Sequence, residues 1–327
     1  MGSTHLKAWG KTPGAGLVAV FDFDERRLAG DLSAVQGNLG GPGEQLDFSA
    51  VRQYRELDAL LADAEIEAVD VCLPTDLHEP VAIAALRAGK HVLVEKPMAL
   101  DGAAADRMAA EAETCGRVLM TAQVLRFIPE YLALEEAVHR TGMGAMRAAI
   151  FRRRCAAPAW GGWLKDAARS GGGVFDLLIH DVDMCLHLFG RPEAVAATGH
   201  VDASRSIDTL QAQWFYTDGA VVTVTGGWQH PGAFPFSMEY SVTLDGGTVE
   251  YSSAGRAPTL YAGGGEQVLA FEGGDGYAGE IAYFAECCSA GRQPERCPPR
   301  ESADAVKLML RMLEARSGNG EKMTCRL

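Results

Sequence analysis

The sequence predicts an α/β protein in two parts: a parallel sheet covered by helices, then an α+β domain with a large, mostly antiparallel, open sheet. Apolar strand-like segments alternate with amphipathic segments through the first third of the chain, which is the rhythm of βαβ units. From about Met146 the strand-like segments follow one another between Gly-rich turns. A chain of 327 residues can bury two cores. We therefore predict domains at 1–124 and 125–327, with a closing helix able to pack back on the first.

The elements of the first domain are expected from hydrophobic periodicity. Gly2 and the polar pair after it lead into an amphipathic segment ending at Trp9, which is typical of a helix entered from a glycine turn. Apolar and β-branched segments predict strands at 16–22, 69–74, 91–97 and 117–123. The segments between them predict helices at 25–32, 54–68, 78–90 and 100–116. Strands that are apolar on both faces and alternate with helices indicate a parallel sheet.

The second domain is expected to be rich in strands. Its strand-like segments are 146–154, 194–203, 209–219, 220–229, 236–247, 248–253, 258–265 and 266–274. One helix is predicted among them, at 171–190, and two more close the chain, at 276–290 and 301–316. The run FRRRC at 151–155 should alternate between the two faces of its strand and leave at least one arginine in solvent.

Composition narrows the class of protein. A formal net charge of −13 and a pI near 5.1 oppose binding to nucleic acid or to an anionic membrane, because both need a concentrated basic surface. The eight cysteines include no Cys-x-x-Cys pair, and the N-terminus has no apolar leader, so we expect reduced thiols and a cytoplasmic protein. No apolar stretch approaches the length of a membrane-spanning helix.

A glycine and an acidic residue near the start have the spacing of a dinucleotide-binding loop. In that fold a strand runs into Gly-x-Gly-x-x-Gly, and an acidic residue about 20 positions on binds the adenosine ribose. Gly2 and Asp22 fit the third glycine and that acid. The first strand, which belongs between 17–21 and 69–73, would then be missing, so we expect a gap there and a true start upstream of Met1. The alternative is that Gly2 merely follows an initiator Met and that Asp22 caps a helix.

Three motifs follow one another along the rest of the chain. They are a Pro-x-x-x-His turn at 74–78, a Glu-Lys-Pro strand end at 95–97, and a Gly-rich helix start that leads to Asp-x-x-x-His-x-x-Asp at 176–183. In this order and spacing they resemble the glucose–fructose oxidoreductase and inositol dehydrogenase family (Gfo/Idh/MocA), over nearly the whole chain. The resemblance implies an NAD(P)-dependent oxidoreductase with an N-terminal Rossmann domain and a C-terminal domain whose open sheet serves homo-oligomerisation.

The residues of these motifs suit hydride transfer from a secondary alcohol. That reaction also removes the hydroxyl proton, so it needs a base near neutral pH and a cation that stabilises the developing alkoxide. His180 and Lys96 suit those roles, and Asp176, four residues before His180 on one helix, would orient the imidazole. The resemblance places the same three residues in the catalytic cluster. The alternative is structural, because a histidine on an apolar helix usually belongs to the core and a lysine before proline usually lies on the surface.

Further binding residues are expected around this cluster. The cofactor-binding set is Gly2, Asp22, Pro74, Thr75, His78, Glu95 and Lys96. The substrate-binding set is Arg126, Trp163, Asp176 and His180, with Trp160 and Lys165 as further candidates and packing as the alternative for Trp163. Asp22 would bind ribose hydroxyls and repel a 2′-phosphate, so NAD is expected in preference to NADP, although Arg26 and Arg27 could reach such a phosphate. Asp76 is expected only to cap the next helix.

No metal is expected, because the four candidate ligands of the motif helix, Asp176, His180, Asp183 and His187, span too much length to converge on one ion. The predicted function is hydride transfer between NAD(P) and a secondary alcohol of a sugar, cyclitol or related polyol, which binds in the cleft between the domains. Two alternatives stay open: a truncated, non-catalytic family member that serves as scaffold or ligand sensor, and an NAD-dependent glycosidase on the same fold.

Overall fold

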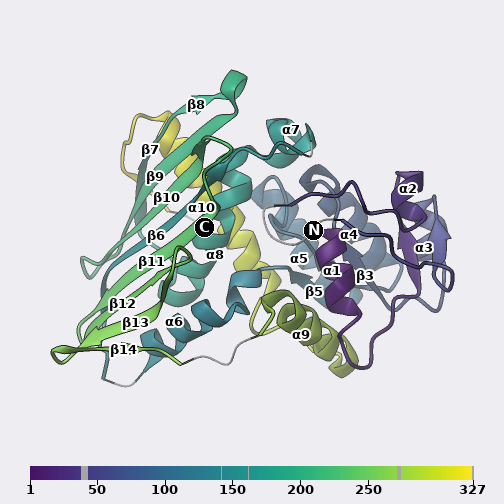
Figure 1. Ribbon diagram of the computed structural model, residues 1–327, viewed down its shortest axis with the longest axis horizontal. Helices are drawn as coiled ribbons and strands as arrows, with labels where there is room; N and C mark the ends of the chain where they lie inside the picture. Colours follow the sequence, from purple (N-terminus) through teal and green to yellow (C-terminus); the bar gives the residue numbers. More distant parts are fainter. Residues whose placement is uncertain (38–42, 141, 161, 271–273, 326–327) are drawn as a thin grey trace.

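The computed structural model describes residues 1–37, 43–140, 142–160, 162–270 and 274–325. Figure 1 shows short strands and helices of the N-terminal half on one side and a single large sheet on the other, with α8 (Gly173–Phe189) and α10 (Pro299–Ser317) between them. This arrangement confirms the predicted fold class. Among the helices that the structure describes, none is both long and apolar enough to cross a bilayer.

The strands of the first half are parallel, but they form two separate sheets. β1 (Ala19–Phe21) pairs with β2 (Arg52–Tyr54), whereas β3 (Ala68–Val71), β4 (His91–Val94) and β5 (Leu119–Thr121) form the other sheet in that order. Within the described ranges no ladder joins β1 to β3. The structure therefore contains the interruption expected between 17–21 and 69–73, and each of these two strands keeps an edge without a strand partner.

Two helices complete the three-stranded sheet. α4 (His78–Arg87) and α5 (Gly102–Cys115) follow β3 and β4, as predicted, and bury apolar side chains in the core, among them Leu86 and Met108. The start of α5 is fixed by Asp101, whose carboxylate accepts a hydrogen bond of 2.8 Å from the Ala104 amide. The helix ends at Gly116 in the left-handed conformation.

The helix predicted at 54–68 is wrong. Its first residue, Tyr54, belongs to β2 and lies opposite Phe21, and only the short α3 (Leu57–Leu61) follows. The backbone of this segment completes a parallel ladder with β1, and that pairing outweighs the local helical periodicity. The preceding helix is also shorter than predicted, because α2 is a single turn at Glu25–Leu28.

The second half is built on one sheet of ten strands, in the order β14–β13–β12–β11–β6–β10–β9–β7–β15, with β8 beside β9. The strands are β6 (Met146–Ala156), β7 (Ala194–Thr198), β8 (Val201–Asp202), β9 (Ile207–Phe215), β10 (Val221–His230), β11 (Ser237–Leu244), β12 (Gly247–Ser252), β13 (Arg256–Ala262), β14 (Gly265–Val268) and β15 (Met323–Thr324). The predicted antiparallel pairing holds except between β6 and β10, which are parallel.

One face of this sheet is covered by α6 (Pro129–His139), α8 and α10, and no described helix lies on the other face (Figure 1). The run at 151–155 alternates as predicted, because Phe151, Arg153 and Cys155 are buried while Arg152 and Arg154 are less so. The Arg152 side chain is the most solvated of the three arginines.

The closing helices return to the first half. α9 (Gly276–Ala290) has the predicted bounds and packs on α1 (Gly2–Trp9), where the rings of Trp9 and Phe284 lie 6.1 Å apart edge to face. α10 is joined to α5 by the ion pair of Lys307 and Asp106, at 2.6 Å. The first half therefore buries part of its apolar surface against the last fifty residues of the chain. The eight cysteines are all unpaired.

Candidate active site

The Gly-rich start of α8 fixes the direction of the motif helix. Gly172 has φ +94°, and a side chain on Gly173 would meet the Trp228 ring at 2.5 Å, so both positions need glycine. The Val174 amide donates to the Asp208 carboxylate at 2.8 Å, which satisfies one of the free N–H groups of the first turn. The helix thus begins tightly against the large sheet.

Lys96 and Asp176 meet across the boundary between the two halves. Lys96 follows β4, and Asp176 lies in the first turn of α8. The Lys96 Nζ donates to the Asp176 main-chain oxygen at 2.9 Å and to Oδ1 at 3.0 Å. Both side chains are mostly shielded from solvent, so their attraction is screened less than that of a surface pair.

His180 lies one turn further along α8 and is partly exposed. Burial first, and then the positive charges of Lys96 and Arg153, lower the pKa of His180 well below its ordinary value. Its Nδ1 is buried and has no hydrogen-bond partner among the described residues, so the accessible part of this partly exposed ring is its other edge. The ring is therefore an uncharged imidazole within reach of the Lys96 charge.

Asp176 does not orient the imidazole as expected. Its carboxylate binds Lys96, and among the described residues no hydrogen bond joins it to His180. The ammonium is the stronger partner, because it carries a full positive charge that attracts the carboxylate and the uncharged imidazole does not.

Glu95 is buried, and its carboxylate contacts residues of the N-terminal half. Its Oε1 lies 3.0 Å from His5 Nε2, and its Oε2 accepts from the Lys96 amide at 3.0 Å. Burial alone would raise the pKa of Glu95, but His5 and Lys96 outweigh it and lower the pKa to about 2. Glu95 thus fixes the backbone at Lys96 through the hydrogen bond from the Lys96 amide.

His5 is a site residue that the sequence reasoning missed. Besides Glu95, its ring contacts Asp70, with Nδ1 and Oδ2 2.9 Å apart, and Trp9 Nε1 donates to the same carboxylate at 2.7 Å. Burial opposes the charge on the ring, but Asp70 holds the pKa of His5 well above its ordinary value. His5 follows Gly2 by three positions on α1, and this Gly-x-x-His spacing was the only available signal.

His78 and its neighbours shape the end of β3. Each nitrogen of the buried His78 ring lies 2.8 Å from a carbonyl oxygen, those of Leu73 and Pro97. The ring therefore ties the loops after β3 and β4 together and offers no free nitrogen to a cofactor, contrary to expectation. Pro74 and the buried Thr75 stay at the carboxyl end of β3, where ligands of parallel sheets bind.

Gly2 and Asp22 occupy the kinds of position that the dinucleotide-binding pattern predicts, which are the start of a helix and the end of a strand. Gly2 begins α1, and a Cβ there would contact the Cys72 Cβ at 3.6 Å, so helix and strand approach closely. Asp22 follows β1 and is part-exposed. It accepts from the Asp24 amide at 2.8 Å and forms two bonds with the Arg27 guanidinium, at 2.8 and 2.9 Å.

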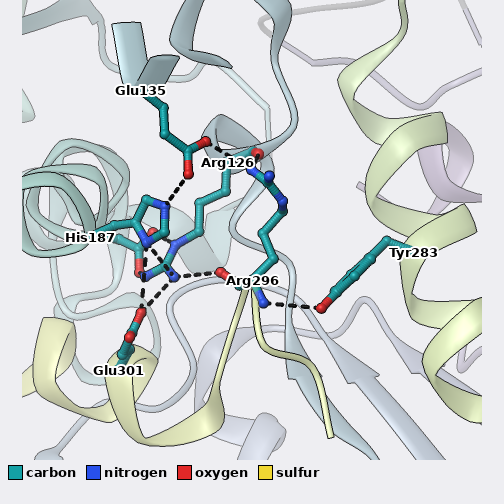
Figure 2. Close-up of polar contacts among 7 residues, drawn as sticks. Arg126, Glu135, His187, Tyr283, Arg296 and Glu301 are labelled. Carbon is teal, nitrogen blue, oxygen red and sulfur yellow. Dashed lines mark hydrogen bonds and ion pairs between the residues drawn. The ribbon is translucent and has the colours of Figure 1, made fainter. Parts of the chain in front are cut away.

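Arg126 does not bind substrate from its observed position. Figure 2 shows it inside a network that also contains His187, Glu135, Arg296 and Glu301. The guanidinium is fully buried, forms bonds of 2.7 and 2.8 Å with the Asp183 carboxylate, and donates at 2.6 Å to the Arg296 main-chain oxygen. It is therefore a structural clamp on the flank of α8.

Trp163 and Lys165 lie on the turn η3 (Gly162–Lys165), which follows β6 and precedes the short helix α7 (Ala167–Ser170). Trp163 is partly buried and Lys165 is exposed, and Trp160, before the turn, is partly buried. Asp76 does not cap the next helix, because α4 begins without a side-chain cap; instead, Asp76 Oδ2 accepts a hydrogen bond of 3.1 Å from the Arg169 Nε of α7.

The structure groups one set of candidate metal ligands: His5, Asp70 and Cys72, with ligand atoms within 4.8 Å of one another. These three already bond to one another, and burial raises the pKa of the Cys72 thiol to about 12. On the motif helix, Asp183 binds Arg126, and His187 lies 3.0 Å from Glu135.

Both halves of the chain match models of one protein family. Residues 1–123 match the oxidoreductase family with an NAD-binding Rossmann fold, and residues 131–250 match the GFO/IDH/MocA C-terminal domain. The chain is 33% identical to inositol 2-dehydrogenase 2 of Saccharopolyspora erythraea over 205 residues, which are 61% of this chain and 54% of that protein. It spans about half the length of the curated relatives that it matches.

Solved structures share the fold over almost the entire chain. An aldose–aldose oxidoreductase from Caulobacter crescentus, complexed with glycerol, has a TM-score of 0.82 at 21% identity and covers 98% of this chain and 94% of its own. GenD2 from gentamicin A biosynthesis, in complex with NAD, has a TM-score of 0.82 at 24% identity and covers 100% and 94%.

Proposed function

Because the chain belongs to the Gfo/Idh/MocA oxidoreductases, with their NAD-binding Rossmann domain, we propose that it is a dehydrogenase acting on a secondary alcohol of a sugar, cyclitol or related polyol. The observation that carries the proposal is the meeting of Lys96 and Asp176 between the two halves, beside an uncharged His180. Relatives named inositol 2-dehydrogenase support the substrate class.

The residues divide the proton chemistry between them. The Lys96 ammonium stabilises the oxygen of the alcohol as it becomes an alkoxide, and Asp176 holds that ammonium in place. The accessible edge of the uncharged His180 ring accepts the hydroxyl proton. A nicotinamide cofactor held by the first half would supply the acceptor for the hydride. The partial burial of Lys96, Asp176 and His180 limits water at the reacting atoms.

Residues of the first half fit a dinucleotide. α1 begins at Gly2, close to Cys72 directly after β3, so its start is the proposed place of a pyrophosphate, and Pro74 and Thr75 follow the same strand. Asp22 would bind the ribose hydroxyls. NAD is proposed over NADP because Arg27 is paired with Asp22 and Arg26 with Asp31, at 2.9 Å from its Nε, so neither is free for a 2′-phosphate.

The setting of the enzyme is part of the proposal. The open face of the ten-stranded sheet, where Ile150 is half exposed, is the proposed surface of homo-oligomerisation. The unpaired cysteines support a cytoplasmic location, and the acidic composition speaks against a nucleic-acid partner.

The test is an assay of the full chain with inositols, sugars and aryl glycosides, each with NAD and with NADP. We expect NADH to appear with at least one polyol, at a higher kcat/KM for NAD than for NADP. Phenol release from an aryl glycoside would favour the glycosidase. Binding of a sugar without turnover would favour the ligand sensor.

A further inference from the structure

A second contact joins the two halves, apart from that of Lys96 and Asp176. Asp76 lies on the turn η1 (Thr75–Leu77), directly after β3, and Arg169 lies on α7 of the second half. The Arg169 Nε donates to Asp76 Oδ2 at 3.1 Å, across 93 positions of sequence. The other oxygen of Asp76 is buried without a partner among the described residues, so Arg169 is the group that balances this carboxylate.

The segment 162–172, which carries Arg169, is held together by hydrogen bonds between its own residues. Asp166 caps α7 by accepting from the Ala168 amide at 3.0 Å. The Ser170 hydroxyl donates to the Leu164 main-chain oxygen at 2.8 Å and accepts from the Gly172 amide at 3.0 Å. Because these bonds link its turn η3, its helix and its end, the segment is held as one unit that leads directly into α8.

The position of this unit relates it to the active site. At one end it continues into α8, which carries Asp176 and His180, and through Arg169 it touches the turn that contains Thr75. In Figure 1, α7 stands between the large sheet and the N-terminal half. Trp163 and Lys165 belong to the same unit. In the view of Figure 1 the unit lies near the top of the boundary between the two halves, and α9 lies near the bottom.

We propose that Asp76 and Arg169 are positioning residues: their ion pair latches segment 162–172 onto the nucleotide-binding half and so holds Trp163 and Lys165 over the polyol site. This inference rests on the proposed function. The pair touches neither Lys96 nor His180, so it acts on the affinity for the alcohol rather than on the chemical step. The side chains of Arg169 and Asp76 are 40% and 27% exposed to solvent. The attraction between them therefore weakens as the salt concentration rises.

The kinetic test uses Asp76→Asn, Arg169→Gln and the exchanged pair Asp76→Arg with Arg169→Asp. Each single change should raise the KM for the polyol about two- to fivefold, the range of a part-exposed ion pair, and leave kcat nearly unchanged. The exchanged pair should restore the KM. Arg87→Gln, which removes a surface ion pair between α4 and α5, is the matched control and should leave the KM unchanged. A KM that stays at the wild-type value in both single variants overturns the proposal.

A second measurement needs no activity. Trypsin cleaves after the exposed Lys165, and Asp76→Asn leaves that site intact. Cleavage at Lys165 should become about two- to fivefold faster in Asp76→Asn and should not change in Arg87→Gln. Equal cleavage rates in the wild type and Asp76→Asn overturn the latch even if the chain is no dehydrogenase. Faster cleavage without any dehydrogenase activity would instead leave the latch standing and refute the proposed function.

Discussion

At the scale of single residues, burial shifts the pKa of a basic and of an acidic side chain in opposite directions. It keeps His180 uncharged, because the imidazolium would lose its hydration and face Lys96 and Arg153. It also raises the pKa of Glu280, on α9, well above its ordinary value, and the negative charges of Glu95 and Asp70 add to the effect of burial. Both shifts favour the neutral form, the uncharged imidazole of His180 and the protonated carboxyl group of Glu280.

We expect His180→Ala to lower kcat by about a hundredfold or more, the scale of a lost general base. The pKa of His180 is lowered, so the wild-type ring stays uncharged as the pH falls past 6.5 and loses its basic form only at lower pH. A profile of kcat/KM against pH should therefore lose activity well below pH 6.5. The exposed His139→Ala serves as control and should behave like the wild type. A profile that falls at the ordinary value of histidine would contradict this assignment.

Glu280→Gln should stabilise the protein increasingly as the pH rises. Within the described part of the chain, neither carboxyl oxygen of Glu280 has a hydrogen-bond partner, and the folded protein favours the protonated group. Since its folded pKa is raised, the wild type keeps full stability only below the unfolded value of 4.5 and loses it as the pH rises toward the folded pKa. The amide cannot ionise and has no such loss.

The measurement is urea unfolding of both proteins at pH 5 and pH 8. The difference in free energy of unfolding should be larger at pH 8. Glu286→Gln, an exposed position on the same helix, should show a difference that hardly changes with pH. Equal differences at the two pH values for Glu280→Gln would show that the group is ionised in the fold.

At the scale of elements, the Arg126 clamp joins the turn η2 (Val124–Arg126) to α8 and to the chain before α10. Arg126→Met should destabilise the protein by about 3–5 kcal/mol, because it leaves the Asp183 carboxylate buried without its partner. Replacing Asp183 by Leu as well should recover much of the loss. Arg147→Met, in an exposed ion pair with Asp245, should cost about 1 kcal/mol or less. Urea unfolding of the four proteins decides, and a loss below about 1 kcal/mol in Arg126→Met would contradict the clamp.

Hydrophobic periodicity predicts most elements of this fold because most of them bury one regular face. The bounds of α9 agree residue by residue, β4 and β5 lie within their predicted ranges, and β3 begins one residue before its range. The prediction fails at 54–68, where a ladder with β1 decides the structure of Tyr54 and no local pattern records that distant partner.

In the site, too, the sequence predicts what a local motif records and does not predict contacts between residues that are far apart in the chain. The motifs predict that Lys96 and Asp176 share a site, and the structure brings them together. Whether a polar motif residue faces the cleft or the interior depends on its partners, which lie far away in sequence. His5 is 65 positions from Asp70, and Arg169 is 93 from Asp76, so spacing carried no signal of either contact.

At the scale of the whole molecule, the first half does not close its core alone. Leu93 and Met120, from the three-stranded sheet, share a buried cluster with Ile281 and Phe284 of α9. A fragment of residues 1–124 should therefore fail to fold cooperatively, because it exposes that apolar surface to water. Circular dichroism and urea unfolding of the fragment, beside the full chain, test this. A sharp transition of the fragment would show that its core is sufficient.

The return of α9 to the first half also bears on how the protein is made. About 160 residues separate Met120 from Ile281, so a ribosome adding about 5 to 20 residues per second needs roughly 10 to 30 seconds to deliver the missing side of that cluster. During this interval the nascent sheet presents Leu93 and Met120 uncovered. The protein is thus a natural client for chaperones that shield apolar surface until synthesis ends.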